Sequence, residues 1–567
     1  MPVIRPGARP GVVYTPSSVA GPMVRIALEP LLRGRTSEQV LALRVCDPAM
    51  GEGAFLVEVI EVLAEALREA WRAEGVPGGD ARRAVTRCVA GVDIDGRAVA
   101  IARAALGCEE RALRVGDALE LDWSDAFPEA FAAGGFDAIV GNPPYIRQEW
   151  LGAGKPALQG FASYDGVADL YVYFVELAHR LARPDGRYCL ITPNKWLTAA
   201  YGRPLRSYLA EQSSVEGVVD LSRSPLFAEA DAFPCIVWGS VGEPRRTPIR
   251  ASRVGGGVIV ADALRDAGVP HPRERWRAEP WHIDAPDDRA LIDRLERAWP
   301  ALGDVVRERP SRGVVTGCNR AFVVDRATRD RLLAEEPSTA ALLRPFVKGR
   351  DIRPWQPEHV ERWILLVDRG TSLDGYPAAH AHLARFREAL EPRPANHRGA
   401  WQGRKPGTYR WHELQDPVGA LAASRSPRLL YQDIQTGPAC SIDRSGELVP
   451  DTTVWILPST DLFLLAVLNS SLYGWYAQRR FPPALGGSVR PKLEYIRALP
   501  IASPTAATRS DIERLVEQRI ALDDERRAGD DRASRIAREL DAAIDDAVLG
   551  AYELRPAERT QLSQRLT

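Results

Sequence analysis

From residue 40 to about residue 240, short apolar runs alternate with longer amphipathic stretches. The short runs include "LALRVCDP", "RCVAGVDID", "FDAIVGNPPY" and "GRYCLITP", and the longer ones include "AFLVEVIEVLAEALREAW" and "ADLYVYFVELAHRLA". Repeated strand, helix and strand predict an α/β fold with a Rossmann-like, doubly wound parallel sheet. We expect ligands to bind at the edge where the carboxyl ends of the strands meet the amino ends of the helices.

The pattern changes after this region. The predicted first domain covers residues 1–245, and residues 246–300, rich in Pro, Arg and Gly, predict a connector with a short helix near 287–298. Short strands, turn residues and frequent tryptophans predict a mixed α+β domain over 301–505. Residues 506–567 predict a charged helical tail, in which Ser510 with Glu513 three residues later matches a capping box.

Composition places the chain among globular proteins without a membrane span. It has 567 residues, of which 45% are hydrophobic and 26% are charged, and no apolar run approaches the length of a transmembrane helix. The first residues lack the apolar core of a signal peptide, so we expect a cytoplasmic protein. The seven cysteines form no CxxC pair and the eight histidines form no HxxxH or HExxH pattern, so we expect neither a disulfide framework nor a metal site.

Charge is distributed unevenly although the net charge is only −1. Residues 1–300 have 35 basic and 40 acidic side chains, residues 301–500 have 28 and 21, and residues 501–567 have 11 and 14. The middle block therefore has an excess of +7 (28 − 21), the only basic excess in the chain. A basic excess in one domain favours contact with nucleic acid, although a solvated surface would also fit this count alone.

Three consecutive predicted strands each end at a carboxylate. Asp47 in "VCDPAMGEGAFL" precedes a turn with Gly51 and Gly53, where backbone N–H groups at a helix start can approach a ligand. Asp93 in "GVDID" is placed to accept hydrogen bonds from ribose hydroxyls, and Asp117 in "GDAL" can accept one from the amine of adenine. Such a pocket suits an adenosine with a cationic tail, S-adenosylmethionine, better than NAD, whose pyrophosphate favours GxGxxG. Any one of these acids could instead cap a helix.

The fourth predicted strand ends in "GNPPY", residues 141–145. An exocyclic amine on a ring is a poor nucleophile because its lone pair is delocalised. The Asn142 side-chain oxygen and the Pro143 carbonyl can accept its two hydrogens and free that lone pair. The two prolines, Pro143 and Pro144, fix the backbone, and Tyr145 offers a face on which a planar base can stack.

In order, "GVVYTP", "DPAMGEGAFL", "GVDID", "GDAL" and "GNPPY" resemble the gamma-type N6-adenine DNA methyltransferases similar to TaqI. The resemblance implies a class I S-adenosylmethionine-dependent fold, with the "YTP" segment folded over the methionine end of the cofactor and Ile94 packed on its ring. It also implies a downstream aromatic that stacks on the flipped base, for which Phe227 is the first choice and Phe233 the second. The implied cofactor-binding set is Tyr14, Thr15, Pro16, Asp47, Pro48, Ala49, Gly51, Gly53, Asp93, Ile94, Asp117, Ala118 and Asn142.

Four further segments, "GVVTGCNRAFVVD", "LLRPFVKGRDIRPW", "LLAVLNSSLYGWYAQ" and "LEYIRALPI", resemble the TaqI-type C-terminal specificity domain of type II and type IIG restriction-modification proteins. The resemblance extends over roughly residues 11–555 and implies a target-recognition domain that binds double-stranded DNA. The expected DNA-binding residues are Thr316, Gly317, Asn319, Lys348, Arg350, Arg490 and Lys492. None of the five lysines follows an acid by two positions, so we expect no nuclease domain here.

The sequence thus favours a site-specific enzyme that methylates the N6 amine of a flipped-out adenine in duplex DNA. It would act in a restriction-modification or phage-defence system, with a separately encoded endonuclease or defence subunit as a possible partner. Three alternatives stay open: an NPPY enzyme that methylates protein glutamine or RNA, a non-catalytic DNA-binding subunit, and an N4-cytosine methyltransferase.

Overall fold

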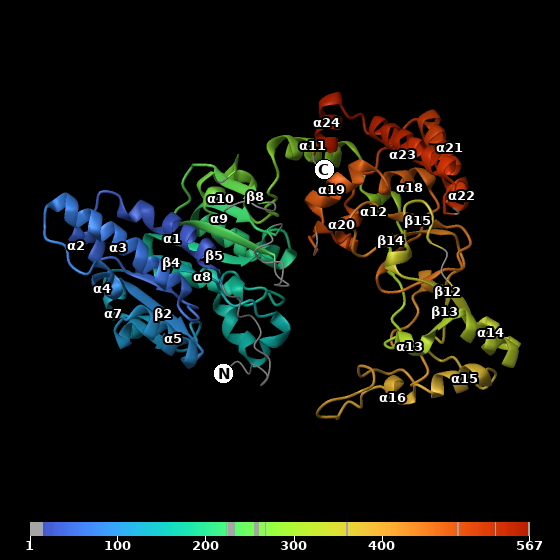
Figure 1. Cartoon of the computed structure of the whole chain (residues 1–567), viewed down its shortest axis with the longest axis horizontal. Coiled ribbons are helices and arrows are strands. Elements are labelled where there is room, and N and C mark those ends of the chain that lie inside the picture. Colours follow the sequence, from blue (N-terminus) through green and yellow to red (C-terminus); the bar gives the residue numbers. More distant parts are fainter. Residues whose placement is uncertain are drawn as a thin grey trace. The chain divides into compact units, whose positions relative to one another are not determined.

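The computed structural model describes residues 15–564 apart from 223, 225–232, 255–259, 267, 359–360, 485–486 and 528. The chain divides into two compact units, Met1–Pro286 and Asp287–Thr567, which can be followed by colour in Figure 1. Each unit has its own buried hydrophobic clusters, so each is described by itself.

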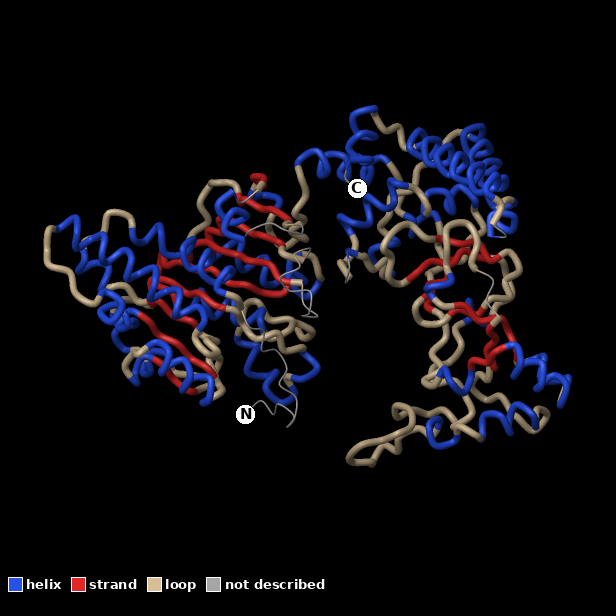
Figure 2. Tube along the Cα trace, viewed as in Figure 1, coloured by secondary structure: helices blue, strands red, loops and turns tan. Residues whose placement is uncertain are grey.

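Nine strands form one sheet in the first unit, in the order β3-β2-β1-β4-β5-β7-β6-β8-β9 (Figure 2). They are β1 (Val45–Asp47), β2 (Val89–Asp93), β3 (Leu113–Val115), β4 (Phe136–Gly141), β5 (Ala182–Pro193), β6 (Ser213–Asp220), β7 (Pro234–Val241), β8 (Ile249–Arg253) and β9 (Val269–His271). Neighbouring strands from β3 to β5 are parallel, whereas β7 runs antiparallel to both β5 and β6. The predicted α/β fold is confirmed, with a mixed sheet instead of a parallel one because β7 enters between β5 and β6 in the reverse direction.

Helices cover both faces of this sheet. They are α1 (Ser17–Leu32), α2 (Ser37–Leu41), α3 (Ala54–Glu74), α4 (Ala81–Val85), α5 (Gly96–Leu106), α6 (Trp123–Ala126), α7 (Pro128–Ala132), α8 (Tyr171–Leu181), α9 (Arg203–Gln212) and α10 (Val260–Asp266). In β4, Ala138 and Val140 join the cluster under α1 and α3, and Ile139 joins the cluster under α8 and α9. Successive residues of a strand face opposite sides, so this continuous apolar run marks a strand buried on both faces.

Residues 246–286 belong to the first unit, although the sequence predicts them as a connector. β8 pairs with β6 and β9 pairs with β8, so they extend the sheet at its edge. Trp276 stacks on Trp281 at 5.0 Å between ring centroids, and Trp281 packs edge-on against Trp196 at 5.3 Å. Short edge strands with polar residues lack a strong apolar pattern, which explains the difference. The expected helix near 287–298 is α11 (Pro286–Ala298).

The second unit contains two four-stranded sheets, in the orders β10-β17-β14-β15 and β11-β13-β12-β16. Their strands are β10 (Ser311–Arg312), β11 (Val323–Asp325), β12 (Leu343–Val347), β13 (Arg362–Leu365), β14 (Arg428–Gln432), β15 (Cys440–Asp443), β16 (Val449–Pro450) and β17 (Val454–Leu457). The helices around them are α12 (Leu302–Val305), α13 (Asn319–Phe322), α14 (Arg326–Glu335), α15 (Pro377–Ala384), α16 (Arg387–Leu390), α17 (Ala420–Ala423), α18 (Leu462–Leu468), α19 (Ser471–Arg480) and α20 (Leu493–Arg497). This arrangement agrees with the predicted α+β character.

The C-terminal residues are helical, as expected: α21 (Ala506–Ala521), α22 (Asp523–Arg527), α23 (Asp531–Ala551) and α24 (Pro556–Gln564). The predicted capping box is wrong, because α21 begins earlier. Thr505 is its N-cap and accepts a hydrogen bond from the Thr508 backbone N–H, so Ser510 lies inside the helix. Ile512 and Val516 of α21 join the cluster that includes α18 and α23, so these helices are part of the second unit's core.

All seven cysteine thiols are free, and those of Cys46, Cys88, Cys189, Cys235 and Cys440 are buried. Among the helices that the structure describes, none has the length and apolar character needed to cross a membrane.

Candidate active site

The four predicted carboxyl ends lie at one edge of the first sheet. β1 and β2 are neighbouring parallel strands, and their last residues are Asp47 and Asp93. Asp117 comes two residues after β3, and Asn142 directly follows β4. Because all four strands are parallel, their carboxyl ends meet on the same side. The structure therefore brings together residues that lie almost one hundred positions apart in sequence.

Asp47 is buried and electrostatically unfavourable as an anion. Its Oδ1 accepts a hydrogen bond from the Ala49 backbone N–H at 2.9 Å. Burial, with a smaller effect of the nearby Asp93 charge, raises the pKa of Asp47 to about 8. A cationic group beside this carboxyl would favour its ionised form, so the position is suited to a positively charged ligand group.

Gly141 lets β4 approach Asp47 closely. A Cβ atom at residue 141 would lie 2.6 Å from Asp47 Oδ1, which is closer than atoms can pack. The glycine of "GNPPY" is therefore required by the neighbouring strand, in addition to any role in the turn.

Two backbone turns share the Asp93 carboxylate. The Gly51 backbone N–H donates to Asp93 Oδ2 at 2.8 Å, and the Asp95 backbone N–H donates to Asp93 Oδ1 at 2.8 Å. Gly51 and Gly53 have φ angles of 52° and 90°, and Gly53 is the N-cap of α3 with no side-chain cap. Each carboxylate oxygen has a second lone pair, so Asp93 can still accept hydrogen bonds from ligand hydroxyls.

Apolar side chains are exposed beside these acids. Ile94, directly after β2, and Val115, the last residue of β3, are each 58% exposed. Asp117 is fixed in its turn because its Oδ1 accepts from the Leu119 backbone N–H at 3.0 Å. Exposed aliphatic groups next to hydrogen-bond acceptors form a surface suited to a nucleoside ring. Sequence reasoning missed Val115, and its place at the end of the third apolar run is the signal that could have identified it.

The "GNPPY" segment is tied to both the amino-terminal segment and the sheet. Asn142 Nδ2 donates to Thr15 Oγ1 at 3.1 Å, and Thr15 is buried just before α1. The Tyr145 hydroxyl donates to the Ile191 carbonyl oxygen at 3.5 Å, and its ring packs edge-on against Tyr171 with centroids 6.3 Å apart. Burial raises the pKa of Tyr145 well above its ordinary value, so its hydroxyl stays neutral.

Two predicted site residues, Tyr14 and Phe227, lie outside the described residues. The second-choice aromatic, Phe233, is half-buried, and its carbonyl oxygen accepts from the Asn194 backbone N–H at 2.7 Å. Asn194 Nδ2 in turn donates to Asp220 Oδ1 at 3.2 Å. Through these two hydrogen bonds, Asn194 in the turn after β5 links the end of β6 to the residue just before β7.

The predicted DNA-binding turn in the second unit is compact. Buried Thr316 donates from Oγ1 to Asn319 Oδ1 at 2.7 Å and accepts from the Cys318 backbone N–H at 3.1 Å. Gly317, with a φ angle of 71°, is exposed. The hydroxyl of Thr316 is thus used inside the turn, and Gly317 and Asn319 are its accessible members.

The predicted basic residues differ in how accessible they are. The Arg350 side chain is 74% exposed, and Lys348, two positions earlier, is half-buried. Lys492 is exposed. Arg490 is paired with the buried carboxylate of Asp433, which also lies 3.2 Å from Arg312 and accepts from Trp455 Nε1 at 2.9 Å. Arg490 is thus held in an ion pair within the fold and shares this carboxylate with Arg312. Its partner lies 57 residues away in sequence, so no local pattern shows the pair.

Comparison with known proteins finds similar restriction-modification methyltransferases. The model of the Eco57I restriction-modification methylase matches residues 87–227, which include β2 to β6 and the "GNPPY" segment. Over these residues the chain is similar to the Eco57I restriction-modification methylases. It is 29% identical over 534 residues to the Type II methyltransferase M.PaeR7I of Pseudomonas aeruginosa, covering 87% of this chain and 85% of that protein. It is 25% identical over 553 residues to the Type II methyltransferase M.BstVI of Geobacillus stearothermophilus, covering 90% and 93%.

A solved structure shares the fold of this chain. It is the structure of the Type IIL restriction-modification enzyme MmeI in complex with DNA, with a TM-score of 0.62, 14% identity and coverage of 97% of this chain and 76% of that one. The chain is therefore a type II restriction-modification methyltransferase with the α/β methyltransferase fold. Among its described residues, no group of three or more His, Cys, Asp or Glu side chains is arranged to hold a metal ion.

Proposed function

We propose that this chain is an adenine-specific DNA methyltransferase, which transfers a methyl group from S-adenosylmethionine to the N6 amine of an adenine flipped out of duplex DNA. The observation that carries the proposal is the position of Asn142. It follows β4 beside Asp47, and its amide is oriented by the buried hydroxyl of Thr15 at 3.1 Å.

The residues present fit S-adenosylmethionine, which when bound supplies an electrophilic methyl group. Asp47, with a raised pKa, suits the cationic methionine part of the molecule. Asp93 can accept from ribose hydroxyls, Asp117 can accept from the adenine amine, and the exposed Ile94 and Val115 can pack on the adenine ring. The glycine turn before α3 leaves room for the backbone to approach the ligand.

Catalysis follows from the chemistry of the "GNPPY" segment. The Asn142 side-chain oxygen and the Pro143 carbonyl accept the two hydrogens of the target amine, which makes its lone pair available for attack on the methyl carbon. The Tyr145 ring, fixed by Tyr171 and the Ile191 carbonyl, provides a wall for stacking the base. No strong base is needed, because the amine proton becomes acidic once the nitrogen is alkylated.

The second unit would recognise the DNA sequence. Its +7 excess, the exposed Arg350 and Lys492, and the turn at Gly317 and Asn319 support this role. Since the relatives are type II methyltransferases, we also propose that a separately encoded endonuclease with the same recognition sequence is the partner.

One experiment tests the function directly. The chain is expressed in cells that lack DNA methylation, and modified bases are mapped by long-read sequencing, with Asn142→Ala as the inactive variant. We expect a recurring motif that contains N6-methyladenine in the parent and no methylation in Asn142→Ala, whose melting temperature stays close to that of the parent. Methylated cytosine, or transfer only to protein or RNA, would refute the proposal.

A further inference from the structure

A basic arm extends from the second unit between α16 and α17, in residues 391–412. Five of its residues are Lys or Arg and only one, Glu391, is acidic. Glu391 is already paired with Arg387 at 2.8 Å. None of these residues was expected to bind DNA from the sequence resemblance, and the arm accounts for +4 (5 − 1) of the +7 excess in 301–500.

One buried arginine anchors the arm. The Arg404 side chain is 4% exposed and donates to five carbonyl oxygens, those of Leu390, Thr316, Glu413, Arg410 and Trp411, at 2.7–3.3 Å. Its guanidinium also lies over the Tyr409 ring at 4.4 Å, with Arg369 over the same ring at 4.8 Å. The bond to the Thr316 carbonyl joins the arm to the predicted DNA-binding turn, so the two form one continuous structure.

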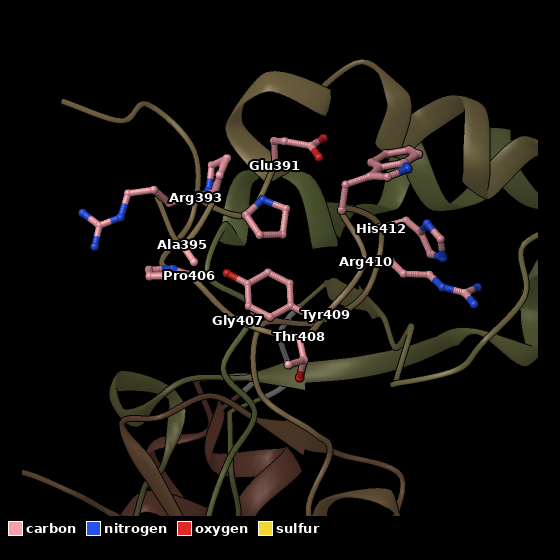
Figure 3. A pocket seen from close by; sticks show the side chains of 12 residues that line it. Glu391, Arg393, Ala395, Pro406, Gly407, Thr408, Tyr409, Arg410 and His412 are labelled. Atoms are coloured by element: carbon pink, nitrogen blue, oxygen red, sulfur yellow. The ribbon is translucent and has the colours of Figure 1, made fainter. Parts of the chain in front are cut away.

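Backbone hydrogen bonds join the two legs of the arm beside a hollow. The Arg393 backbone N–H donates to the Arg404 carbonyl oxygen at 3.1 Å, and the Arg404 backbone N–H donates to the Glu391 carbonyl oxygen at 3.0 Å. Residues 391–395 and 406–412 line a cavity of about 600 Å³, with Tyr409 at its centre. Figure 3 shows the Arg393 and Arg410 side chains pointing outward on opposite sides of this cavity.

The remaining four cations of the arm lie at its surface. Arg393, Arg398, Lys405 and Arg410 are all exposed. Throughout the part of the chain that the structure describes, no carboxylate lies within ion-pair distance of Arg393, Arg398 or Lys405, and Arg410 reaches Glu413 only at 3.9 Å. A rigidly anchored loop that presents four such cations is complementary to a polyanion.

We infer that the basic arm binds the phosphodiester backbone of the DNA duplex and continues the contact surface that begins at the Thr316 turn. Phosphate contacts are favoured over base reading because the arm's exposed donors are cations on flexible side chains, whereas the Tyr409 ring is covered by Arg369 and Arg404. The inference rests on the proposed function, since it takes the DNA substrate as the ligand.

The test replaces the four exposed cations together, with Arg393→Gln, Arg398→Gln, Lys405→Gln and Arg410→Gln in one arm variant. The matched control replaces four exposed arginines of α21 and α23, at the opposite end of the unit in Figure 1, with Arg514→Gln, Arg532→Gln, Arg535→Gln and Arg538→Gln. Both variants lose the same charge, so a general change in net charge cannot distinguish them.

Binding to a duplex with the mapped recognition site is measured for the full chain from 0.05 to 0.3 M salt. The logarithm of the association constant falls linearly with the logarithm of the salt concentration. Each lost phosphate contact makes this slope about 0.9 less steep and weakens binding about fivefold at 0.15 M salt. We expect the arm variant to lose about two to four units of slope. Its methylated motif in cells should be unchanged, because phosphate contacts do not read sequence. The control should keep the parent slope, and all three proteins should melt alike.

Several outcomes would overturn the inference. If the arm variant keeps the parent slope while the parent methylates DNA, the arm does not contact the backbone, and the proposed function still stands. An altered methylated motif would mean that the arm reads bases. An equal loss of slope in the control would show a non-specific charge effect. A parent that neither binds nor methylates any duplex would refute the proposed function and the arm's role together.

Discussion

The hydrogen bond between Asn142 and Thr15 offers a specific test of how the catalytic amide is held. Thr15→Val replaces the buried hydroxyl by a methyl group of similar volume, so packing before α1 is largely kept while the acceptor for Asn142 Nδ2 is lost. An amide that is no longer held through its nitrogen can rotate, and its oxygen then spends less time in the orientation that accepts a hydrogen from the target amine. The change therefore acts on the reaction through Asn142.

The size of the effect follows from the kind of bond. The donor and acceptor are both neutral and lie 3.1 Å apart, which is an ordinary hydrogen-bond distance. Such a bond contributes about 0.5–1.5 kcal/mol net. If this free energy is lost in the transition state alone, the rate of methyl transfer falls by roughly 2- to 13-fold.

The assay is single-turnover methyl transfer to a duplex with the recognition site, at saturating S-adenosylmethionine and DNA. Thr15→Ser is the matched control, because it keeps the hydroxyl and should stay near the parent rate. A Thr15→Val enzyme that transfers as fast as Thr15→Ser would show that this bond does not orient the amide. Cofactor affinity, measured by calorimetry for both variants, separates an effect on Asn142 from an effect on cofactor binding.

Three further predictions concern the pocket and the arm. Because the pKa of Asp47 is raised to about 8 in the folded chain, its contribution to stability is complete below the unfolded pKa near 4 and is lost as pH rises through 8. The melting temperature should therefore fall more steeply between pH 5 and 8 in the parent than in Asp47→Asn, and equal slopes would contradict this. Ile94→Ala removes apolar surface from the expected ring platform and should weaken S-adenosylmethionine binding about 5- to 30-fold by calorimetry, whereas unchanged affinity would place the ring elsewhere. Arg404→Lys cannot reach all five carbonyl oxygens and should lower the unfolding free energy of the second unit by about 2 kcal/mol in denaturant melts, whereas the exposed Arg410→Lys should have little effect.

The sequence contains enough information to locate the edge of the sheet where the candidate site lies. Asp47, Asp93 and Asn142 each come at or directly after the end of an apolar run, and parallel strands place such ends together. The direction of β7 is not encoded in this way, because an apolar run looks the same in a parallel and an antiparallel strand. The sequence predicts a connector where the short strands β8 and β9 lie. These strands are at the edge of the sheet, where few positions need to be apolar, so they lack the pattern of a buried strand.

Contacts between distant residues are harder to anticipate. Arg490 looks like a free cation in "GGSVRPK", but it pairs with Asp433, which directly follows β14 and lies 57 residues away in sequence. Arg404 looks like one more basic residue of a loop, yet its acceptors are carbonyl oxygens, which every residue has and no sequence pattern marks. The anchoring of the basic arm therefore becomes visible only in the structure.

The Arg404 anchor also limits how the DNA sequence preference of this chain could be changed by exchanging segments with a related protein. Its guanidinium holds carbonyl oxygens from the Thr316 turn on one side and from residues 410–413 on the other, nearly a hundred positions later. A recognition element exchanged between relatives would have to include both segments, because either one alone would leave buried N–H groups facing a foreign backbone. An exchanged segment that keeps all five of the Arg404 hydrogen bonds would have to span at least residues 316–413, so the turn and the arm should vary together among relatives.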